Sequence, residues 1–412
     1  MSAQNFLPYG RQHITEEDIK AVLEVLQSDW LTQGPAVANF EDALCDYIGA
    51  RNTVVCSSGT AALHLAMLAL GLEKGDAVVT VPNTFVASAN CARLVGAEVR
   101  FVDIDPETGL MDIKALETVL QNDQTHKIKA VIPVHFAGQP VDLPAIYGLA
   151  KSHGAWVVDD ACHAIGADYT YNSKALKIGG NPHSDLTVFS FHPVKHIACG
   201  EGGAVTTDYA DLADRLRLFR NHGIVRRNFV NSALAETDGV PNSWYYEMVE
   251  MGLNYRLTDI QAALGASQLR HLPDSLARRR RLAGIYRDLI RNRFKNGEVV
   301  PLGVHKGVGH AYHLFVVRID FEKLNVSRAV VMNRLRAKGV GTQVHYIPVH
   351  LQPYYRRNCG TGPGNFPGSE SYYRQTLTLP MYPDLTDDNL RLVVDQLAEA
   401  LIPVSHRQTL VQ

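Results

Sequence analysis

Apolar residues along the chain follow two patterns that alternate between about residue 50 and residue 220. Short apolar runs rich in Val, Ile and Phe indicate buried strands, and longer segments with apolar residues at helical spacing indicate helices. This alternation predicts an α/β fold, a mostly parallel sheet flanked by helices, whose ligands collect at the carboxyl ends of the strands. The predicted strands begin at Val54 and then cover residues 77–81, 98–104, 129–136, 155–160, 186–191 and 203–207.

The two ends of the chain carry different patterns. Thr15 is suited to cap a helix that bears apolar residues at helical spacing. Pro273 marks a predicted boundary, and strands and helices beyond it indicate a smaller α+β domain. We therefore predict a large domain over residues 15–272 and a small one over residues 273–412, with residues 1–14 packed against the latter. The elements predicted beyond the boundary are strands at 312–319 and 341–346 and helices at 328–338 and 387–401.

Composition narrows the functional classes. The chain has 412 residues, of which 46% are hydrophobic and 20% charged, enough for a large core and a second domain. A net charge of -2 gives no electrostatic footprint for nucleic acid. The six cysteines show no CxxC pair and no zinc-like spacing, so no metal site is expected. Without a signal peptide or an apolar run of about 18 residues, we expect a cytoplasmic protein that acts on small molecules away from membranes.

The turn after the first predicted strand is rich in small residues. Ser57, Gly59 and Thr60 precede a strongly helical apolar segment at residues 61–70. Backbone N–H groups at a helix N-terminus, together with the helix dipole, favour a bound phosphate. Ordinary capping of the helix by Ser or Thr explains the same residues equally well.

Two further strand ends carry aromatic and acidic residues. Phe85 follows strand 77–81 and could stack on a planar ring, although it could also belong to the core. Strand 155–160 ends in Asp159 and Asp160, and a carboxylate there could keep a pyridinium nitrogen protonated. His163 could then lie over a ring, and a helix-capping Asp with an ordinary buried histidine is the alternative.

A lysine follows the strand at residues 186–191. The segment SFHPVK, residues 190–195, places Lys195 just past the strand end, and the glycines of GEGG, residues 200–203, allow a tight turn. A lysine on a rigid turn can form a Schiff base if its pKa is lowered. A surface lysine without chemistry is the alternative for Lys195 taken alone.

Together these segments supply the parts of a pyridoxal phosphate site: a phosphate turn, an aromatic residue, a strand-end aspartate and a strand-end lysine. Their order resembles the fold-type I aminotransferases, and most closely the sugar-nucleotide aminotransferases of the DegT type. The resemblance extends from Pro8 to about Pro383. The motifs that carry it are SSGT at 57–60, DDACHA at 159–164, SFHPVK at 190–195 and GEGG at 200–203.

The resemblance implies roles for these residues. Lys195 would hold pyridoxal 5′-phosphate as a Schiff base, with pyridoxamine phosphate formed between the two half-reactions. Asp160, rather than Asp159, would meet the pyridine nitrogen; the family usually has Glu-Asp here, so Asp159 departs from its pattern. The remaining cofactor contacts would be Ser57, Gly59, Thr60 and Ser190 at the phosphate and Phe85 and His163 at the ring.

Two later segments also match the family. In GLNYRLTD, residues 252–259, the resemblance implies that Asn254 reaches the cofactor phosphate of a neighbouring subunit, so that a homodimer shares its active sites. Loop capping is the alternative for Asn254. The segment HYIPVH, residues 345–350, resembles the part of the family near the sugar nucleotide. The implied substrate contacts are Tyr9, His345, Tyr346 and His350.

The arginine run at residues 278–281 fits none of these motifs. We expect it to form a solvated helix face, with anion binding as the alternative.

The function implied by the resemblance is a pyridoxal phosphate-dependent transfer of an amino group from glutamate to C4 of a UDP-linked 4-keto-6-deoxy-N-acetylhexosamine. The segments at residues 191–196 and 244–248 are most similar to the branch that makes UDP-4-amino-4,6-dideoxy-N-acetyl-β-L-altrosamine on the pseudaminic acid route. Alternatives are transfer to another UDP-, dTDP- or GDP-linked sugar, a sugar 3-dehydratase, and a non-catalytic sugar-nucleotide-binding protein. Lys195 argues against the dehydratase, which carries His there, and its retention with Asp160 argues against a mere binder.

Overall fold

The computed structural model of the chain describes residues 6–180 and 182–403. Its main sheet has seven strands in the order β1-β9-β8-β5-β4-β2-β3. Neighbours from β3 to β8 run parallel, and β9 is antiparallel to both β8 and β1, which confirms the predicted, mostly parallel α/β fold. The strands are β1 (Asn52–Cys56), β2 (Ala77–Thr80), β3 (Glu98–Phe101), β4 (Ile128–Ile132), β5 (Trp156–Asp160), β8 (Leu186–Ser190) and β9 (Gly203–Thr207).

Helices cover both faces of this sheet, which is why most residues of its strands are buried. Successive strand residues point to opposite faces, so Val54 joins one buried cluster and Val55 the other. The Val54 cluster includes residues of α3 (Gly59–Leu70), α4 (Ala87–Leu94) and α7 (Ala210–Arg220). The Val55 cluster includes residues of α2 (Pro35–Ile48), α5 (Ile113–Gln121) and α6 (Leu143–Ser152).

A 35-residue helix, α8 (Asp259–Arg293), runs through the position where the sequence predicts a boundary. Thr258 caps it, and Pro273 lies inside it with an exposed side chain, so the helix does not end at the predicted boundary. Pro273 removes one backbone hydrogen bond, but the helix packs along its length against α1 (Glu16–Leu26), α2 and α12 (Asp387–Ala400), and this packing outweighs the loss. The proposed division of domains at residues 272/273 therefore falls within a helix.

The C-terminal part of the chain forms a three-stranded antiparallel sheet, in the order β14 (Val299–Pro301), β16 (Phe315–Ile319) and β17 (Thr376–Leu379). Together with α9 (Arg328–Ala337), α12 and the end of α8 it encloses a third apolar cluster. Two connecting helices, α10 (Pro353–Cys359) and α11 (Pro367–Gln375), lie between α9 and β17 in the sequence.

The predicted strand at residues 341–346 is wrong. Within that segment only Gln343 bridges to β17, at Thr378. The backbone of Gly341 bonds instead to Leu7, and the N–H of Tyr346 donates to the side chain of Asn83. Both ends of the segment are thus held by other parts of the chain.

The described part of the N-terminal segment lies beside this sheet. Leu7 forms a bridge with Val340, and the N–H of Met381 donates to the carbonyl oxygen of Tyr9. Thr15 caps α1 with a capping box, as the sequence predicts. Residues 1–5 and 404–412 lie outside the described residues.

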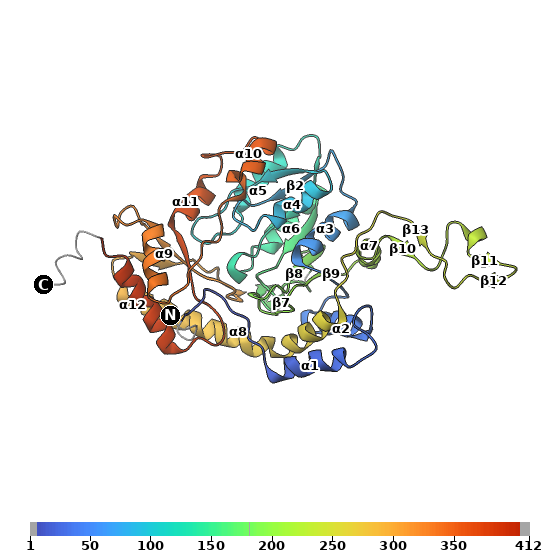
Figure 1. Ribbon diagram of the computed structural model, residues 1–412. Coiled ribbons are helices and arrows are strands. Elements are labelled where there is room, and N and C mark those ends of the chain that lie inside the picture. The colour runs from blue at the N-terminus through green and yellow to red at the C-terminus, as the bar shows by residue number, and fades with distance from the viewer. Residues whose placement is uncertain (1–5, 181, 404–412) are drawn as a thin grey trace.

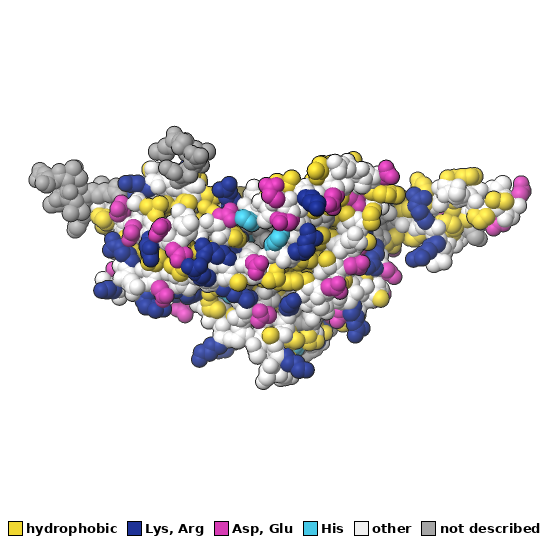
Figure 2. All heavy atoms as spheres, turned by 90° about the horizontal axis from the view of Figure 1, so that it is seen from below, with side chains coloured by type: hydrophobic (Ala, Val, Ile, Leu, Met, Phe, Trp, Pro, Cys, Tyr) yellow, Lys and Arg dark blue, Asp and Glu magenta, His cyan; other side chains and the backbone are white. Residues whose placement is uncertain are grey.

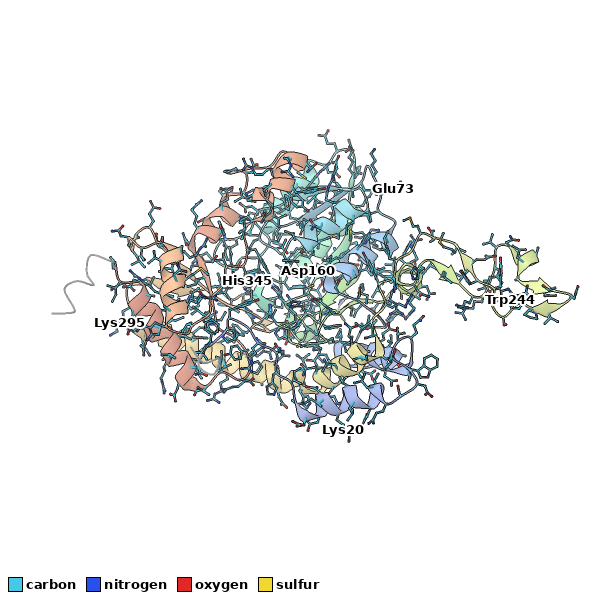
Figure 3. The ribbon with its side chains drawn as sticks, viewed as in Figure 1. Lys20, Glu73, Asp160, Trp244, Lys295 and His345 are labelled. Atoms are coloured by element: carbon cyan, nitrogen blue, oxygen red, sulfur yellow. The ribbon has the colours of Figure 1, made fainter. Side chains whose placement is uncertain are left out.

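An arm projects from the large domain between α7 and α8 (Figure 1). Its apolar side chains are open to solvent: Val230 is 85% exposed and Met251 is 83% exposed. Trp244, labelled on the arm in Figure 3, is 73% exposed. The arm contains the short strands β10 (Ile224–Val225), β11 (Glu236–Thr237), β12 (Val240–Pro241) and β13 (Glu247–Met248) and the turn η3 (Ser232–Leu234).

The remaining elements are short. A small sheet of β15 (Val308–Gly309), β6 (Asp168–Tyr171) and β7 (Lys174–Lys177) adjoins the large domain, and η2 (Phe136–Gly138) and η4 (Val349–Leu351) are single turns. In the described ranges, no helix combines the length and apolar character that crossing a bilayer requires.

Candidate active site

The carboxyl ends of two neighbouring strands bring the acidic and basic candidates together. β5 and β8 are parallel partners, with Asp160 opposite Val188, so Asp160 and Ser190 end at the same edge of the sheet. Lys195 follows on a turn in which its N–H donates to the carbonyl oxygen of His192 at 2.8 Å. The sequence prediction that these groups meet at one sheet edge is thus supported by the topology.

Asp159 and Asp160 are adjacent but serve different surroundings, because successive strand residues point to opposite faces. Oδ2 of Asp160 accepts from the Ser88 hydroxyl at 2.5 Å, and its Oδ1 accepts from the N–H of Cys162 at 3.1 Å. Asp159 is fully buried, with Oδ2 lying 3.5 Å from Nε2 of His135. Burial raises the pKa of Asp159. Of the two, only Asp160 acts electrostatically on Lys195, which favours it as the partner of a ring nitrogen.

Lys195 is half-buried, and the loss of water around its ammonium group lowers its pKa. Cys162 and Asp160 act in the opposite direction but do not cancel this effect. A lysine with a lowered pKa has a larger fraction of neutral amine, which is the form that attacks a carbonyl. The surface-lysine alternative does not fit this environment.

The turn before α3 presents backbone donors. Ser58, rather than Ser57, caps the helix by accepting from the N–H of Ala61 at 3.1 Å. Gly59 and Thr60 occupy the first two helical positions, whose N–H groups have no acceptor within a helix. A Cβ atom on Gly59 would lie 2.9 Å from Cβ of Ser190, so glycine lets the serine approach the helix end. This arrangement suits a phosphate.

Ring-binding candidates lie beside the carboxylate. Phe85 is 56% exposed, so the core alternative for it is wrong, and its ring centroid lies 6.1 Å from that of Tyr346. Nε2 of His163 is 3.2 Å from the Tyr346 hydroxyl, and its Nδ1 has no hydrogen-bond partner among the described residues. Burial lowers the pKa of His163 well below its usual value, so this ring is neutral.

Three of the four predicted substrate contacts group together, and one of them, His345, lies within reach of the charge of Lys195. The rings of Tyr9 and His345 lie 5.4 Å apart, and those of His345 and Tyr346 4.9 Å apart. Burial and the charge of Lys195 lower the pKa of His345 to about 3. Figure 3 shows Asp160 within the large domain and His345 on the side toward the small domain.

Two candidates stand apart from this group. His350 is fully buried, and its Nε2 lies 3.1 Å from a carboxylate oxygen of Glu370 rather than beside Lys195. The Asn254 side chain is exposed and has no hydrogen bond within the described chain. The next residue, Tyr255, accepts from the N–H of Ser57 at 2.9 Å. The roles of Asn254 and His350 stay predictions.

Sequence reasoning missed two neighbours of the site. Ser88, in the first turn of α4, donates to Asp160, and His313 lies with its ring centroid 4.4 Å from that of His163. Ser88 could have been found, because it follows Phe85 at the same sheet edge. His313 comes from the small-domain side, and no local motif indicates that it reaches His163.

The site fits a phosphorylated aromatic aldehyde. Free N–H groups at α3 suit its phosphate, and the lowered pKa of Lys195 suits its carbonyl. The exposed Phe85 and His163, whose Nδ1 has no partner among the described residues, suit its ring.

Comparisons with known proteins agree. Residues 12–398 match the DegT/DnrJ/EryC1/StrS aminotransferase family. Helicobacter pylori PseC, an aminotransferase involved in the biosynthesis of pseudoaminic acid, is 30% identical with a TM-score of 0.84, covering 96% of this chain and 99% of that chain. The PLP form of a putative sugar aminotransferase from Streptococcus pneumoniae is 27% identical with a TM-score of 0.83, covering 96% and 98%.

A curated relative extends the match. Spore coat polysaccharide biosynthesis protein SpsC of Bacillus subtilis is 40% identical over 392 residues, which are 95% of this chain and 96% of that protein. The Streptococcus pneumoniae enzyme is also known in its PMP form, and the cofactor of these proteins is pyridoxal phosphate. With its fold-type I architecture and a family match over residues 12–398, the chain belongs to the DegT/DnrJ/EryC1/StrS aminotransferase family.

Proposed function

We propose that the protein transfers an amino group from glutamate to C4 of a UDP-linked 4-keto-6-deoxy-N-acetylhexosamine, giving UDP-4-amino-4,6-dideoxy-N-acetyl-β-L-altrosamine. The substrate assignment is supported by the likeness to Helicobacter pylori PseC, which is involved in the biosynthesis of pseudoaminic acid. The likeness to a spore coat polysaccharide protein supports sugar chemistry more broadly.

The observation that carries the transaminase assignment is the meeting of Lys195, Asp160 and His163 beside the open N-terminus of α3. When bound here, pyridoxal phosphate supplies the carbon that accepts the amino group and a ring that withdraws electrons. A binding protein for nucleotide sugars would need neither a lysine of lowered pKa nor a carboxylate facing it.

Each residue then has a task. The N–H groups of Gly59 and Thr60, with the Ser190 hydroxyl, hold the phosphate. The negative charge of Asp160 keeps a proton on the ring nitrogen. As a free amine, Lys195 takes a proton from Cα of glutamate in the first half-reaction and delivers one to C4 of the sugar in the second.

The neighbours of the ring set its position and its surroundings. Ser88 fixes the Asp160 carboxylate through its 2.5 Å hydrogen bond. His163 stays neutral and covers one face of the ring, held by its contact with the Tyr346 hydroxyl. The half-buried Tyr9 and the buried His345 lie toward the small domain, where we place the sugar.

We also propose that the active enzyme is a homodimer in which Asn254 completes the phosphate site of its partner. The side chain of Asn254 is exposed and has no hydrogen bond to the described residues of its own chain, which supports this role. The arm at residues 222–252, with exposed apolar side chains such as Trp244, supports association with a second copy.

The experiment that tests the substrate is a panel of UDP-, dTDP- and GDP-linked 4-keto-6-deoxy sugars, incubated with the purified holoenzyme and glutamate. Mass spectrometry should show an amine formed fastest on the UDP-linked N-acetylhexosamine. Faster reaction with a dTDP- or GDP-linked sugar would reassign the substrate. Absence of an amine on every member of the panel would contradict the aminotransferase function proposed for nucleotide sugars.

A further inference from the structure

The arginine run at residues 278–281 does not form the solvated face that its sequence predicts. Arg279 is only 2% exposed, because it lies on the side of α8 that faces the junction of the two domains. Its guanidinium donates to the backbone oxygens of Tyr312 at 3.2 Å and Met381 at 3.1 Å. Arg281, two residues further along the helix, is exposed and pairs with Asp387.

The charge of Arg279 has no carboxylate partner among the described residues. Its Nε is buried without a hydrogen bond in that part of the chain. Burial lowers the pKa of Arg279 to about 10, so the guanidinium remains charged at neutral pH. A buried cation that only carbonyl oxygens surround is costly unless an anion compensates it.

Arg279 lines a cavity of about 330 Å³ that also reaches Lys195. Four cationic side chains line this cavity against two carboxylates, and one of these, Asp384, is already paired with His13 at 2.6 Å. Figure 2, which views the molecule from below, shows histidine side chains near the centre of this face with both basic and acidic side chains around them. The ionisable lining residues are Arg11, His13, Lys195, His196, His271, Asp274, Arg278, Arg279 and Asp384.

The cations at the mouth of this cavity are open to a ligand. Arg11 is exposed, and no hydrogen bond or ion pair holds its side chain within the described chain. Arg278 donates to the carbonyl oxygens of Pro383 and Leu385, which orients its guanidinium, and its nearest carboxylate oxygen, on Asp387, is 4.0 Å away.

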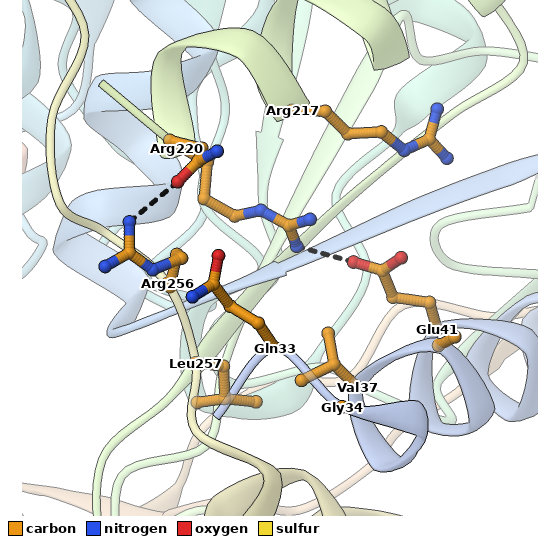
Figure 4. A pocket seen from close by; sticks show the side chains of 10 residues that line it. Gln33, Gly34, Val37, Glu41, Arg217, Arg220, Arg256 and Leu257 are labelled. Atoms are coloured by element: carbon orange, nitrogen blue, oxygen red, sulfur yellow. Dashed lines mark hydrogen bonds and ion pairs between the residues drawn. The ribbon is translucent and has the colours of Figure 1, made fainter. Parts of the chain in front are cut away.

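A second cavity is lined by arginines whose guanidinium groups have partners within the protein (Figure 4). There Arg220 pairs with Glu41 at 2.6 Å, and Arg256 donates to the Asn221 side chain at 2.7 Å. Arg217 pairs with Asp214. In the cavity at Lys195, Arg11 has no polar partner among the described residues, and Arg279 has only backbone carbonyl oxygens there. This difference points to an external anion.

We propose that the cavity bounded by Arg11, Arg278 and Arg279 binds the anionic group of a reaction partner, a phosphate or a carboxylate, whose reacting atom lies at Lys195. The proposal rests on the proposed function, which supplies two such groups: the diphosphate of the nucleotide sugar and the carboxylates of the amino donor. Guanidinium groups are well suited to both, because their fork of donors matches two acceptor oxygens.

The test titrates the pyridoxal phosphate-loaded enzyme with inorganic pyrophosphate and, separately, with 2-oxoglutarate, using calorimetry. Arg11→Gln and Arg278→Gln should each weaken one probe about tenfold or more, as expected for the loss of a charged hydrogen bond. Arg281→Gln is the matched control, because this arginine belongs to the same run but lies outside the cavity. If the variants bind pyrophosphate more weakly, the natural ligand of the cavity is the diphosphate. If they bind 2-oxoglutarate more weakly, it is the carboxylate.

Two further variants separate binding from folding. Arg278→Lys keeps a positive charge and should recover part of the lost affinity. Arg11→Gln changes an exposed side chain without partners, so its effect does not depend on stability. If wild type binds neither probe, or if both Gln variants bind both probes as wild type does, the proposal is overturned.

The half-reactions show whether the bound anion belongs to a reaction partner. Cofactor absorbance reports the reaction with glutamate in the first half-reaction and the reaction with the keto-sugar nucleotide in the second. The Gln variants should raise the half-saturating concentration of at least one of these two substrates. Unchanged values for both would overturn this role. The calorimetry needs no turnover, so an enzyme that binds a probe but aminates no sugar would leave the cavity assigned and refute the proposed function.

Discussion

The two sides of Lys195 are built in different ways. Toward the sheet, the carboxylate and the helix end have defined partners: Asp160 accepts from Ser88, and Ser58 caps α3. Toward α8, cations outnumber the groups that could neutralise them, and Arg279 is buried without a carboxylate. The sheet side is thus arranged to hold the cofactor, and the α8 side is arranged to bind the anionic group of a substrate, which binds and dissociates in each reaction cycle.

Removing Lys195 should have the largest effect, since it joins the two sides. Lys195→Ala should lose turnover, because positioned proton transfer alone contributes about 10²–10⁴-fold. The variant should still bind pyridoxal phosphate non-covalently through Gly59, Thr60 and Ser190, which absorbance after gel filtration at high cofactor concentration would show. Full activity would contradict the role assigned to Lys195.

The adjacent carboxylates of β5 sharpen the account of the sheet side. Asp160→Asn keeps the shape but removes the charge, so the ring nitrogen should lose its proton and activity should fall by orders of magnitude with the fold intact. Asp159→Asn is the matched control, since Asp159 points to His135 within the core and its pKa is already raised. Steady-state rates measure the activity of both variants, and circular dichroism shows whether their fold is intact. A severe loss of activity in Asp159→Asn with a mild loss in Asp160→Asn would show that Asp159 is the partner of the ring nitrogen.

Asn254 tests whether the sheet side is complete within one chain. Asn254→Ala should weaken cofactor retention more than it disturbs folding, because it removes a donor from an anion. Mixing it with Lys195→Ala under subunit exchange should restore partial activity, since one site of a heterodimer then has both residues intact.

The control for this mixing is each variant alone, taken through the same exchange. Mass spectrometry of the intact dimers verifies that heterodimers have formed. If Asn254→Ala is itself crippled and heterodimers recover no activity, the site lies within one chain.

A smaller effect, on the pH dependence of stability, is expected from the buried His345 on the small-domain side. The pKa of His345 is lowered to about 3, whereas an unfolded chain has about 6.5, so its contribution to stability is complete above pH 6.5 and is lost as the pH falls toward 3. The slope should reach at most about 1.4 kcal/mol per pH unit.

Urea unfolding between pH 6.5 and 4 measures this contribution. His345→Gln should flatten the pH dependence of the unfolding free energy, and His305→Gln, at an exposed histidine, should leave it unchanged. An equal slope of unfolding free energy against pH in wild type and both variants would show that His345 does not contribute to this pH dependence.

The sheet side could be predicted from the sequence because its residues are local to strand ends. Strand length, the helix cap and the order of SSGT, DDACHA and SFHPVK place Asp160 and Lys195 without tertiary information. The α8 side could not be predicted, because Pro273 is overruled by packing on several helices, and Arg279 is buried by segments more than thirty residues away in the sequence. His350 likewise turns to Glu370, which no local pattern indicates.

The central claim is that pyridoxal phosphate is bound covalently at Lys195, between these two sides. Borohydride reduction of the holoenzyme fixes the cofactor to the amine that carries it, and peptide mass mapping identifies that residue. We expect the added mass on the peptide that contains Lys195, and none on the same peptide after prior conversion with glutamate. Modification of another lysine, such as Lys151 or Lys177, with Lys195 unmodified would contradict the account.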